Sequence, residues 1–187
     1  MTIGTTDIFL LVAIVSSLVV GFFWGGLRSL MLLAGWVVAF LASAYLRIEL
    51  GSYLAQQWKS FPPAFSDMAA FGIIFVGLMI AVPVAIMIIT KGSQRVIRVQ
   101  VLDDIGGALV AVLVAVLVIA SLLIILASFY GTGEMLIDPQ GGPAWTANLY
   151  QSLLNSNIGR AINEHVVPVI GTLFGPILPA EVREVTG

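Results

Sequence analysis

The sequence predicts an all-α integral membrane protein with four transmembrane helices and an amphipathic C-terminal segment at the membrane interface. Of its 187 residues, 59% are hydrophobic and only 10% are charged, whereas a soluble domain carries roughly 25% charged residues. A water-soluble fold would have too few charges to cover its surface, but lipid removes that demand. The mean hydropathy of +1.07 and the spacing of the few charges support the same prediction.

The charged residues divide the chain into long uncharged stretches. These stretches occupy residues 8–27, 29–46, 68–90 and 105–133 and are rich in Leu, Ile, Val, Ala and Phe. A helix needs about 20 apolar residues to cross a hydrocarbon core roughly 30 Å thick. We therefore expect a four-helix transmembrane domain over residues 1–130, with spans near 8–25, 27–46, 68–90 and 105–129.

Glycine, proline and capping residues indicate how these spans begin, end and bend. Gly25 and Gly26 separate the first two spans, and glycine tolerates the positive φ of a tight reversal, so we expect a close antiparallel hairpin there. Asp7 and Asp103 are candidate N-caps of the first and fourth helices. Pro83 lies inside the third span and is expected to kink it, as membrane helices tolerate.

The aromatic residues agree with these boundaries. Trp24, Trp58 and Trp145 fall near predicted span ends, where indole rings prefer the headgroup level. Trp36 is the exception, because it lies well inside the second span.

Basic residues predict the orientation of the bundle. Arg28 lies in the first connection, and the third connection carries Lys91, Arg95 and Arg98. By the positive-inside rule these two connections face the cytoplasm and both termini lie outside. The second connection carries basic Arg47 and Lys59 together with acidic Glu49 and Asp67.

Two interpretations of the cytoplasmic charges remain open. In one, Lys91, Arg95 and Arg98 only fix the topology and reach toward lipid. In the other, this connection contacts lipid headgroups or a partner, with Arg95 or Arg98 paired to Asp103. Arg28 is likewise either a lipid-phosphate contact or a partner of Asp103 or Asp104.

A C-terminal extramembrane or interfacial segment follows over residues 131–187. Residues 144–164 have the pattern of an amphipathic helix, with apolar residues at Trp145, Leu149, Leu153, Ile158 and Ile162. Residues 166–180 are uncharged but are interrupted by three prolines, so they are too short and too broken to span. We expect them to lie on the membrane surface or to dip into a mouth formed by the helices.

Each span carries small residues at four-residue spacing, which places them on one helix face. Such stripes let helix backbones approach closely in lipid, so we expect them to hold the bundle together; self-association into a homo-oligomer is the alternative. The stripe residues are Ser17, Gly21 and Gly25; Gly35, Ala39 and Ser43; Gly77, Ala81 and Ala85; and Gly107, Ala111 and Ala115.

The sequence contains no pattern typical of catalysis or cofactor binding. The chain has no cysteine, which excludes disulfides and thiolate metal sites, and His165 is the single histidine and has no metal-ligand spacing around it. We therefore expect no enzyme activity, no catalytic residues, no cofactor and no metal. The net charge of −2 and the absence of a basic block argue against nucleic-acid binding.

No acid, base or histidine lies near the centre of a span, which argues against a proton-coupled carrier. A passive channel or small-solute transporter lined by hydroxyl groups stays open as an alternative. Its candidate lining residues are Ser16, Ser17, Thr90 and Ser121.

Two stretches resemble the colicin V production protein (CvpA) family. One runs from Gly25 through Gly26-Leu27-Arg28 into Ala34-Gly35-Trp36, and resembles that family's first hairpin, where a Gly-x-x-Arg turn leads into a helix with a tryptophan. The other, at residues 102–108, resembles the Asp-Arg-x-x-Gly entry to the fourth helix. The family-motif positions are Gly25, Arg28, Asp103 and Gly107, although Asp104 stands where the family usually has arginine. The resemblance covers residues 7–130.

The resemblance implies a small, non-enzymatic protein of the bacterial cytoplasmic (inner) membrane, linked to colicin V secretion and cell-envelope upkeep. We therefore expect an accessory or scaffold protein in toxin or bacteriocin export or in envelope maintenance. Its expected partners are the lipid bilayer and an export or envelope protein. In the channel alternative Pro83 would be a hinge and residues 166–180 a plug; a subunit that only stabilises a larger complex is a third option.

Overall fold

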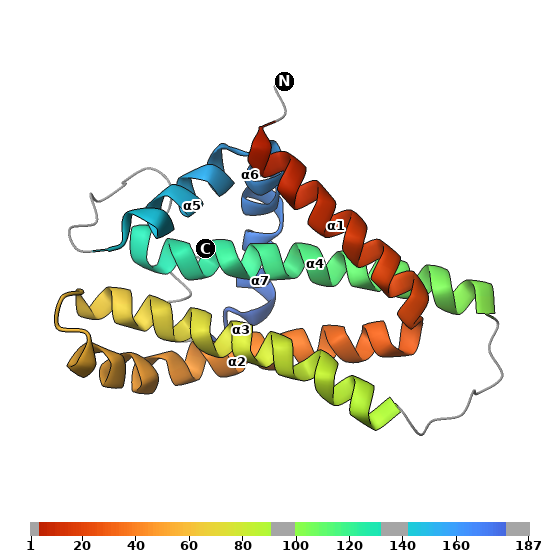
Figure 1. The fold of residues 1–187 in the computed structure, drawn as a ribbon, viewed down its shortest axis with the longest axis horizontal. Coiled ribbons are helices and arrows are strands. Elements are labelled where there is room, and N and C mark those ends of the chain that lie inside the picture. The colour runs from red at the N-terminus through yellow and green to blue at the C-terminus, as the bar shows by residue number, and fades with distance from the viewer. Residues whose placement is uncertain (1–3, 91–99, 132–141, 179–187) are drawn as a thin grey trace.

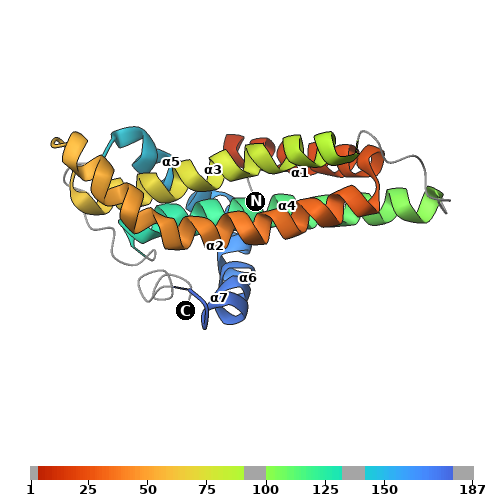
Figure 2. The same cartoon turned by 90° about the horizontal axis from the view of Figure 1, so that it is seen from below.

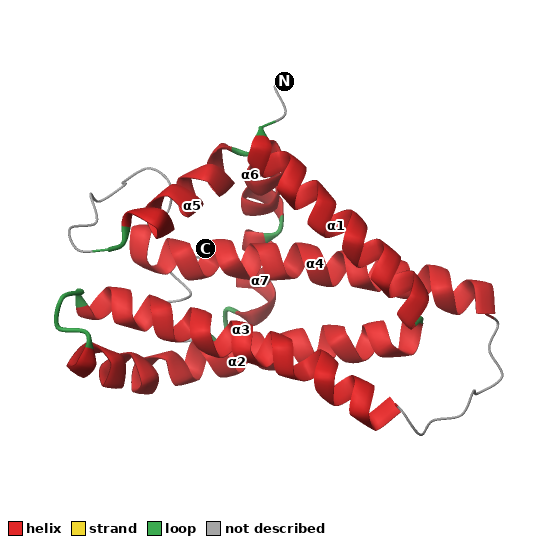
Figure 3. Cartoon of the chain, viewed as in Figure 1, coloured by secondary structure: helices red, strands yellow, loops and turns green. Residues whose placement is uncertain are grey.

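The computed structural model describes residues 4–90, 100–131 and 142–178, and these parts of the chain are almost entirely helical (Figure 3). The four long helices are α1 (Thr5–Trp24), α2 (Gly26–Gln57), α3 (Pro63–Thr90) and α4 (Gln100–Tyr130). Three short helices follow: α5 (Ala144–Asn155), α6 (Asn157–His165) and α7 (Val167–Phe174).

The four long helices are each long and apolar enough to cross a membrane, which confirms the predicted fold class. The second helix differs from its predicted span, because α2 continues past residue 46 to Gln57. Arg47 is therefore a buried helical residue and does not lie in a connection. The helix continues because its last turns pack on the start of α3: a Cβ built on Gly51 would lie 2.0 Å from Asp67 Oδ1.

The long helices pack as two pairs, α2 along α3 and α1 along α4 (Figure 1). The turn at Gly25 is as tight as predicted, with the residue at φ 77°, where only glycine is unstrained. The predicted close hairpin between the first two spans is nevertheless wrong, because α1 and α2 diverge from that turn (Figure 1). The reason is that α1 packs closely along α4 and has few contacts with α2.

Backbone contact at glycine residues joins α1 to α4. A Cβ built on Gly107 would lie 2.5 Å from the Gly21 carbonyl oxygen and 2.6 Å from the Gly25 carbonyl carbon. A Cβ built on Gly21 would lie 2.3 Å from the Ala111 Cβ. Only hydrogen fits at Gly21 and Gly107, so van der Waals packing acts there between main chains.

The C-terminal helices extend the fold beyond the long helices. Figure 2 shows α6 and α7 projecting from one side of the long helices and running across their direction. Helix α5 is fixed to the end of α4, because the Tyr150 hydroxyl donates to the Gly131 carbonyl at 2.8 Å and the Tyr130 and Tyr150 rings stack at 5.6 Å.

The predicted single amphipathic helix over residues 144–164 is instead two helices. The break lies at Ser156, whose backbone is extended and whose hydroxyl accepts a hydrogen bond from the Gly159 N–H at 2.8 Å. This side chain caps the start of α6. Gly159 permits the corner, since a Cβ there would lie 2.0 Å from the Leu153 carbonyl oxygen.

A pair of neighbouring glycines tests the contact between α1 and α4. Gly107→Ala should destabilise the protein by about 1–3 kcal/mol, because the added methyl group has to push two backbones apart. Gly106→Ala is the control: no atom lies within 4 Å of a Cβ at this position, so the change should stabilise the helix by up to about 1 kcal/mol. Thermal unfolding in detergent measures both, and equal melting temperatures for the two variants would contradict the contact.

Candidate functional site

Residues from both motif stretches meet at one end of the bundle, where the turn between α1 and α2 lies beside the start of α4 (Figure 1). The Asp103 Oδ1 atom accepts a hydrogen bond from the Gly26 N–H at 3.1 Å. Gly26 is the first residue of α2, so its N–H has no partner within the helix, and a carboxylate is favourable at this positive end of the helix dipole. Asp103 thus caps α2. The expectation that Asp103 is the N-cap of the fourth helix is wrong, because α4 begins at Gln100 and Asp103 lies within its first turn.

We call Gly21, Gly25, Gly26, Asp103 and Gly107 the hairpin junction. The backbone contacts of Gly107 and the carboxylate of Asp103 lie on the same side of α4, one turn apart, and both meet the turn. The remaining motif residue, Arg28, is half-buried in the first turn of α2. Its pairing with Asp103 or Asp104 stays a prediction. Lys91, Arg95 and Arg98 lie outside the described residues, as does their predicted pairing with Asp103.

A second cluster holds the C-terminal helices to the bundle. Asp7, in the first turn of α1, is only 5% exposed. Its carboxylate accepts hydrogen bonds from the Gly4 N–H, the Asn157 side-chain amide and the Ile158 N–H, each at 3.1 Å. The N-cap of α1 is Gly4, so the expectation that Asp7 is the N-cap is wrong; Asp7 lies in the first turn and accepts from the Gly4 N–H. Asp7 also caps the first turn of α6, which sequence reasoning missed.

Helix α7 packs against one side of the long helices (Figure 2). The Phe174 ring packs edge-on against the Trp36 ring at 5.9 Å and against the Phe40 ring at 6.2 Å. Trp36 is ten residues into α2, which is about 15 Å along the helix axis. The choice between the two expected placements of residues 166–180, on the membrane surface or in a mouth formed by the helices, stays a prediction.

The residues that follow α7 are held in place as well. The Tyr45 hydroxyl donates a hydrogen bond to the Ile177 carbonyl beyond α7. Ile170 and Leu178 are 1% and 5% exposed, so the protein encloses this segment on one side.

Trp36 is explained by this arrangement. Its ring N–H donates to the Ser121 hydroxyl on α4 at 3.0 Å, and both residues are buried. A buried indole N–H needs such a partner. The tryptophan that did not match the interface pattern is therefore a core residue shared by α2, α4 and α7.

The hydroxyl groups expected to line a channel are largely used inside their own helices. Ser17 donates to the Ile14 carbonyl at 2.7 Å, Thr90 to the Ile86 carbonyl at 2.7 Å, and Ser121 to the Leu117 carbonyl at 2.8 Å. They belong to three different helices, and Ser16 is exposed on α1.

The small-residue stripes occupy different environments. The α1 and α4 stripes meet through Gly21, Gly107 and Ala111, with Ser17 and Ala115 half-buried beside them. On α2, Ala39 and Ser43 are fully buried, and a Cβ on Gly35 would lie 2.3 Å from a Val82 methyl carbon.

The stripe on α3 points elsewhere. Gly77, Ala81 and Ala85 are exposed, and no atom lies within 4 Å of a Cβ built on Gly77. Helix α3 instead turns Val82 and Ile86 toward the bundle. The use of the α3 stripe for self-association stays a prediction.

A polar cavity of about 270 Å³ lies near the other end of α2, lined by Arg47, Asp67 and Ser128 among others. Sequence reasoning missed it, because Arg47 and Asp67 were assigned to a connection. The described residues hold no group of three or more His, Asp or Glu side chains that could bind a metal ion.

Comparison with known proteins agrees with the motifs and extends them. A family model described as Colicin V production protein matches residues 6–174. The motif resemblance covers residues 7–130, whereas this match continues to Phe174, the last residue of α7. The three C-terminal helices, α5 to α7, are therefore part of the region that the family model matches. No curated protein and no solved structure matches the chain.

The Asp7 cluster can be tested by substitution. Asp7→Ala should weaken tail docking, because the Ile158 N–H and the Asn157 side-chain amide lose their charged acceptor. The expected result is faster hydrogen exchange in α6 and α7 for the protein in lipid nanodiscs. Glu164→Ala, which removes a carboxylate from the exposed face of α6, is the control and should leave exchange unchanged. Equal exchange in both variants would show that Asp7 does not hold the tail.

Proposed function

The chain belongs to the colicin V production protein family, and from that membership we propose that it is a non-enzymatic accessory or scaffold protein of the bacterial cytoplasmic membrane. It acts in toxin or bacteriocin export or in maintenance of the cell envelope. The observation that carries this proposal is the docked tail, which the family match includes and which presents a fixed polar helix face.

The partner surface in this proposal is the outer face of α6. Gly159 and Ile162 face the bundle and are buried, whereas Arg160, Glu164 and His165 are exposed. Asp7 holds the start of this helix in place. A surface fixed before binding loses less conformational entropy when a partner associates, so a docked α6 suits a scaffold that recruits another protein.

The channel alternative has less support. The hydroxyl groups of Ser17, Thr90 and Ser121 bond to carbonyls of their own helices. Ser121 is also fully buried and accepts the Trp36 N–H, which is a packing role.

The proposed orientation places the hairpin junction in the cytoplasm and the tail outside. Arg28 and the bond from Gly26 to Asp103 put the first connection beside the start of α4, so both lie on the basic side of the protein.

The absence of cysteine makes this orientation directly measurable. Single cysteines at Leu27 and Ser60, both exposed, are treated in intact cells with a membrane-impermeant maleimide. Ser60→Cys should react in intact cells, and Leu27→Cys only after lysis. The reverse pattern would invert the proposed topology.

Photo-crosslinking in cells tests the scaffold proposal. A photoreactive amino acid at Arg160 or Glu164, on the exposed face of α6, should give one recurrent protein adduct that mass spectrometry identifies. Val12, which is 57% exposed on the first transmembrane helix, is the control position and should give only lipid adducts.

Adducts from α6 that contain only lipid or this chain would contradict the partner surface. The same protein adduct from Val12 and α6 would mean that α6 is not the selective contact.

A further inference from the structure

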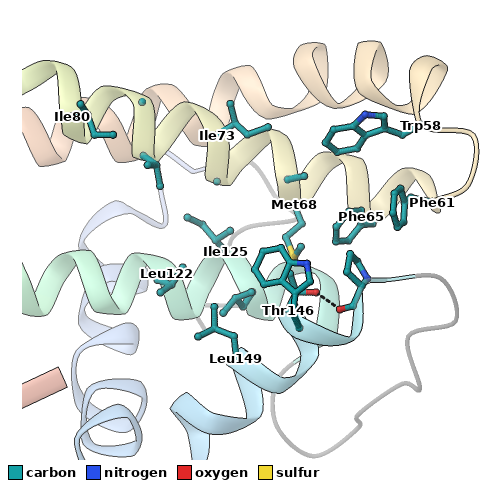
Figure 4. Close-up of a pocket in the computed structure, with 17 residues that line it drawn as sticks. Trp58, Phe61, Phe65, Met68, Ile73, Ile80, Leu122, Ile125, Thr146 and Leu149 are labelled. Atoms are coloured by element: carbon teal, nitrogen blue, oxygen red, sulfur yellow. Dashed lines mark hydrogen bonds between the residues drawn. The ribbon is translucent and has the colours of Figure 1, made fainter. Parts of the chain in front are cut away.

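An apolar groove of about 740 Å³ runs between α3, α4 and α5 (Figure 4). One wall is α3, from Phe65 to Ile80, and the opposite wall is α4, from Leu122 to Leu126. Trp145 and Leu149 of α5 line it as well. The lining side chains are hydrocarbon or aromatic apart from the Thr146 hydroxyl, which donates to the Pro143 carbonyl.

The groove exists because α3 packs on α2 and has few contacts with α4. Two lining residues on α3 are glycines, which add no bulk. A Cβ on Gly72 would have its nearest neighbour at 3.9 Å, and a Cβ on Gly77 would meet nothing within 4 Å.

The groove opens onto the lipid-facing side of a transmembrane helix. Ile73, Val76 and Ile80 line it and are also 52%, 53% and 63% exposed. In the membrane, such exposed apolar side chains of a spanning helix contact acyl chains. The groove is therefore continuous with the bilayer interior.

One end of the groove lies at the level of the membrane interface. Trp58, the C-cap of α2, and Trp145, in the first turn of α5, both line that end, and tryptophan marks the headgroup level. Lys59 follows Trp58 in the loop between α2 and α3 and is exposed, so a cation lies next to the expected phosphates.

The dimensions suit a lipid chain. From Phe65 to Ile80 the wall of α3 is about 22 Å long at 1.5 Å per residue, which exceeds one leaflet of the hydrocarbon core, about 15 Å.

We propose that this groove holds an acyl chain of a phospholipid whose headgroup lies at the Trp58 and Trp145 end. The chain enters at the interface, passes under α5 and ends near Ile80 and Leu122. The bound lipid fills the space between α3 and α4 and contacts the side of α5 that faces the groove. This inference does not depend on the proposed function.

A groove-filling substitution with a matched control tests the site. Gly77→Phe places a ring in the open space of the groove, whereas Ala81→Phe places the same ring one turn away on the same helix, at an exposed residue that does not line the groove. Gly72→Leu is a second filling variant. Thermal unfolding first establishes that each variant is folded.

The full-length protein is reconstituted in vesicles of phosphatidylethanolamine and phosphatidylglycerol. A trace of phosphatidylethanolamine carries a diazirine in the middle of one acyl chain, and illumination is followed by mass spectrometry of the labelled peptides. Labelling should concentrate on the groove walls around Ile73, Val76 and Leu122. It should fall several-fold in Gly77→Phe and Gly72→Leu and stay unchanged in Ala81→Phe.

A second readout is the lipid that remains on the protein after purification in detergent, measured by native mass spectrometry. The unmodified chain should retain phospholipid, and the filled variants should not. Labelling spread evenly over exposed apolar faces such as Phe9 and Phe23 of α1 would overturn the proposal. Equal lipid retention in Gly77→Phe and Ala81→Phe would overturn it as well.

Discussion

The arrangement of the whole protein depends on the contact between the backbones of α1 and α4 at Gly21 and Gly107. With no side chain between them, these helices approach until main-chain atoms touch. The turn at Gly25 then starts α2 in a direction away from α1, and Asp103 fixes that start by capping it. Two helix pairs result, α1 with α4 and α2 with α3, and they join where α2 also packs along α4.

The C-terminal tail packs against one side of these joined pairs (Figure 2). Helix α7 has eight residues, and a helix this short is not stable alone in water. Its structure therefore depends on the surfaces that receive it, which are Asp7 at the start of α6 and the rings of Trp36 and Phe40 around Phe174. The same surfaces fix the exposed face of α6, which connects the packing of the bundle to the scaffold role.

The sequence predicts the four spans because the cost of burying charge in lipid restricts where charges occur. It also predicts the tight turn at Gly25 and the small residues of α1 and α4. It does not predict that Asp7 meets Ile158, since that bond joins positions 151 apart and leaves no local pattern. The length of α2 is missed for a similar reason, because packing of Gly51 on α3 outweighs the charges of Arg47 and Glu49 that suggested a helix end.

Quenching of tryptophan fluorescence by lipids brominated in the middle of the acyl chain tests the docked tail most directly. Four variants of the full-length chain each keep one tryptophan and replace the others with phenylalanine. Trp36 lies in the middle of the predicted second span and so at the expected depth of the bromine atoms, but it is 2% exposed because α4 and Phe174 cover it. The account predicts that Trp36 is quenched least of the four. Strongest quenching at Trp36 would mean that lipid reaches it and that the tail does not cover it.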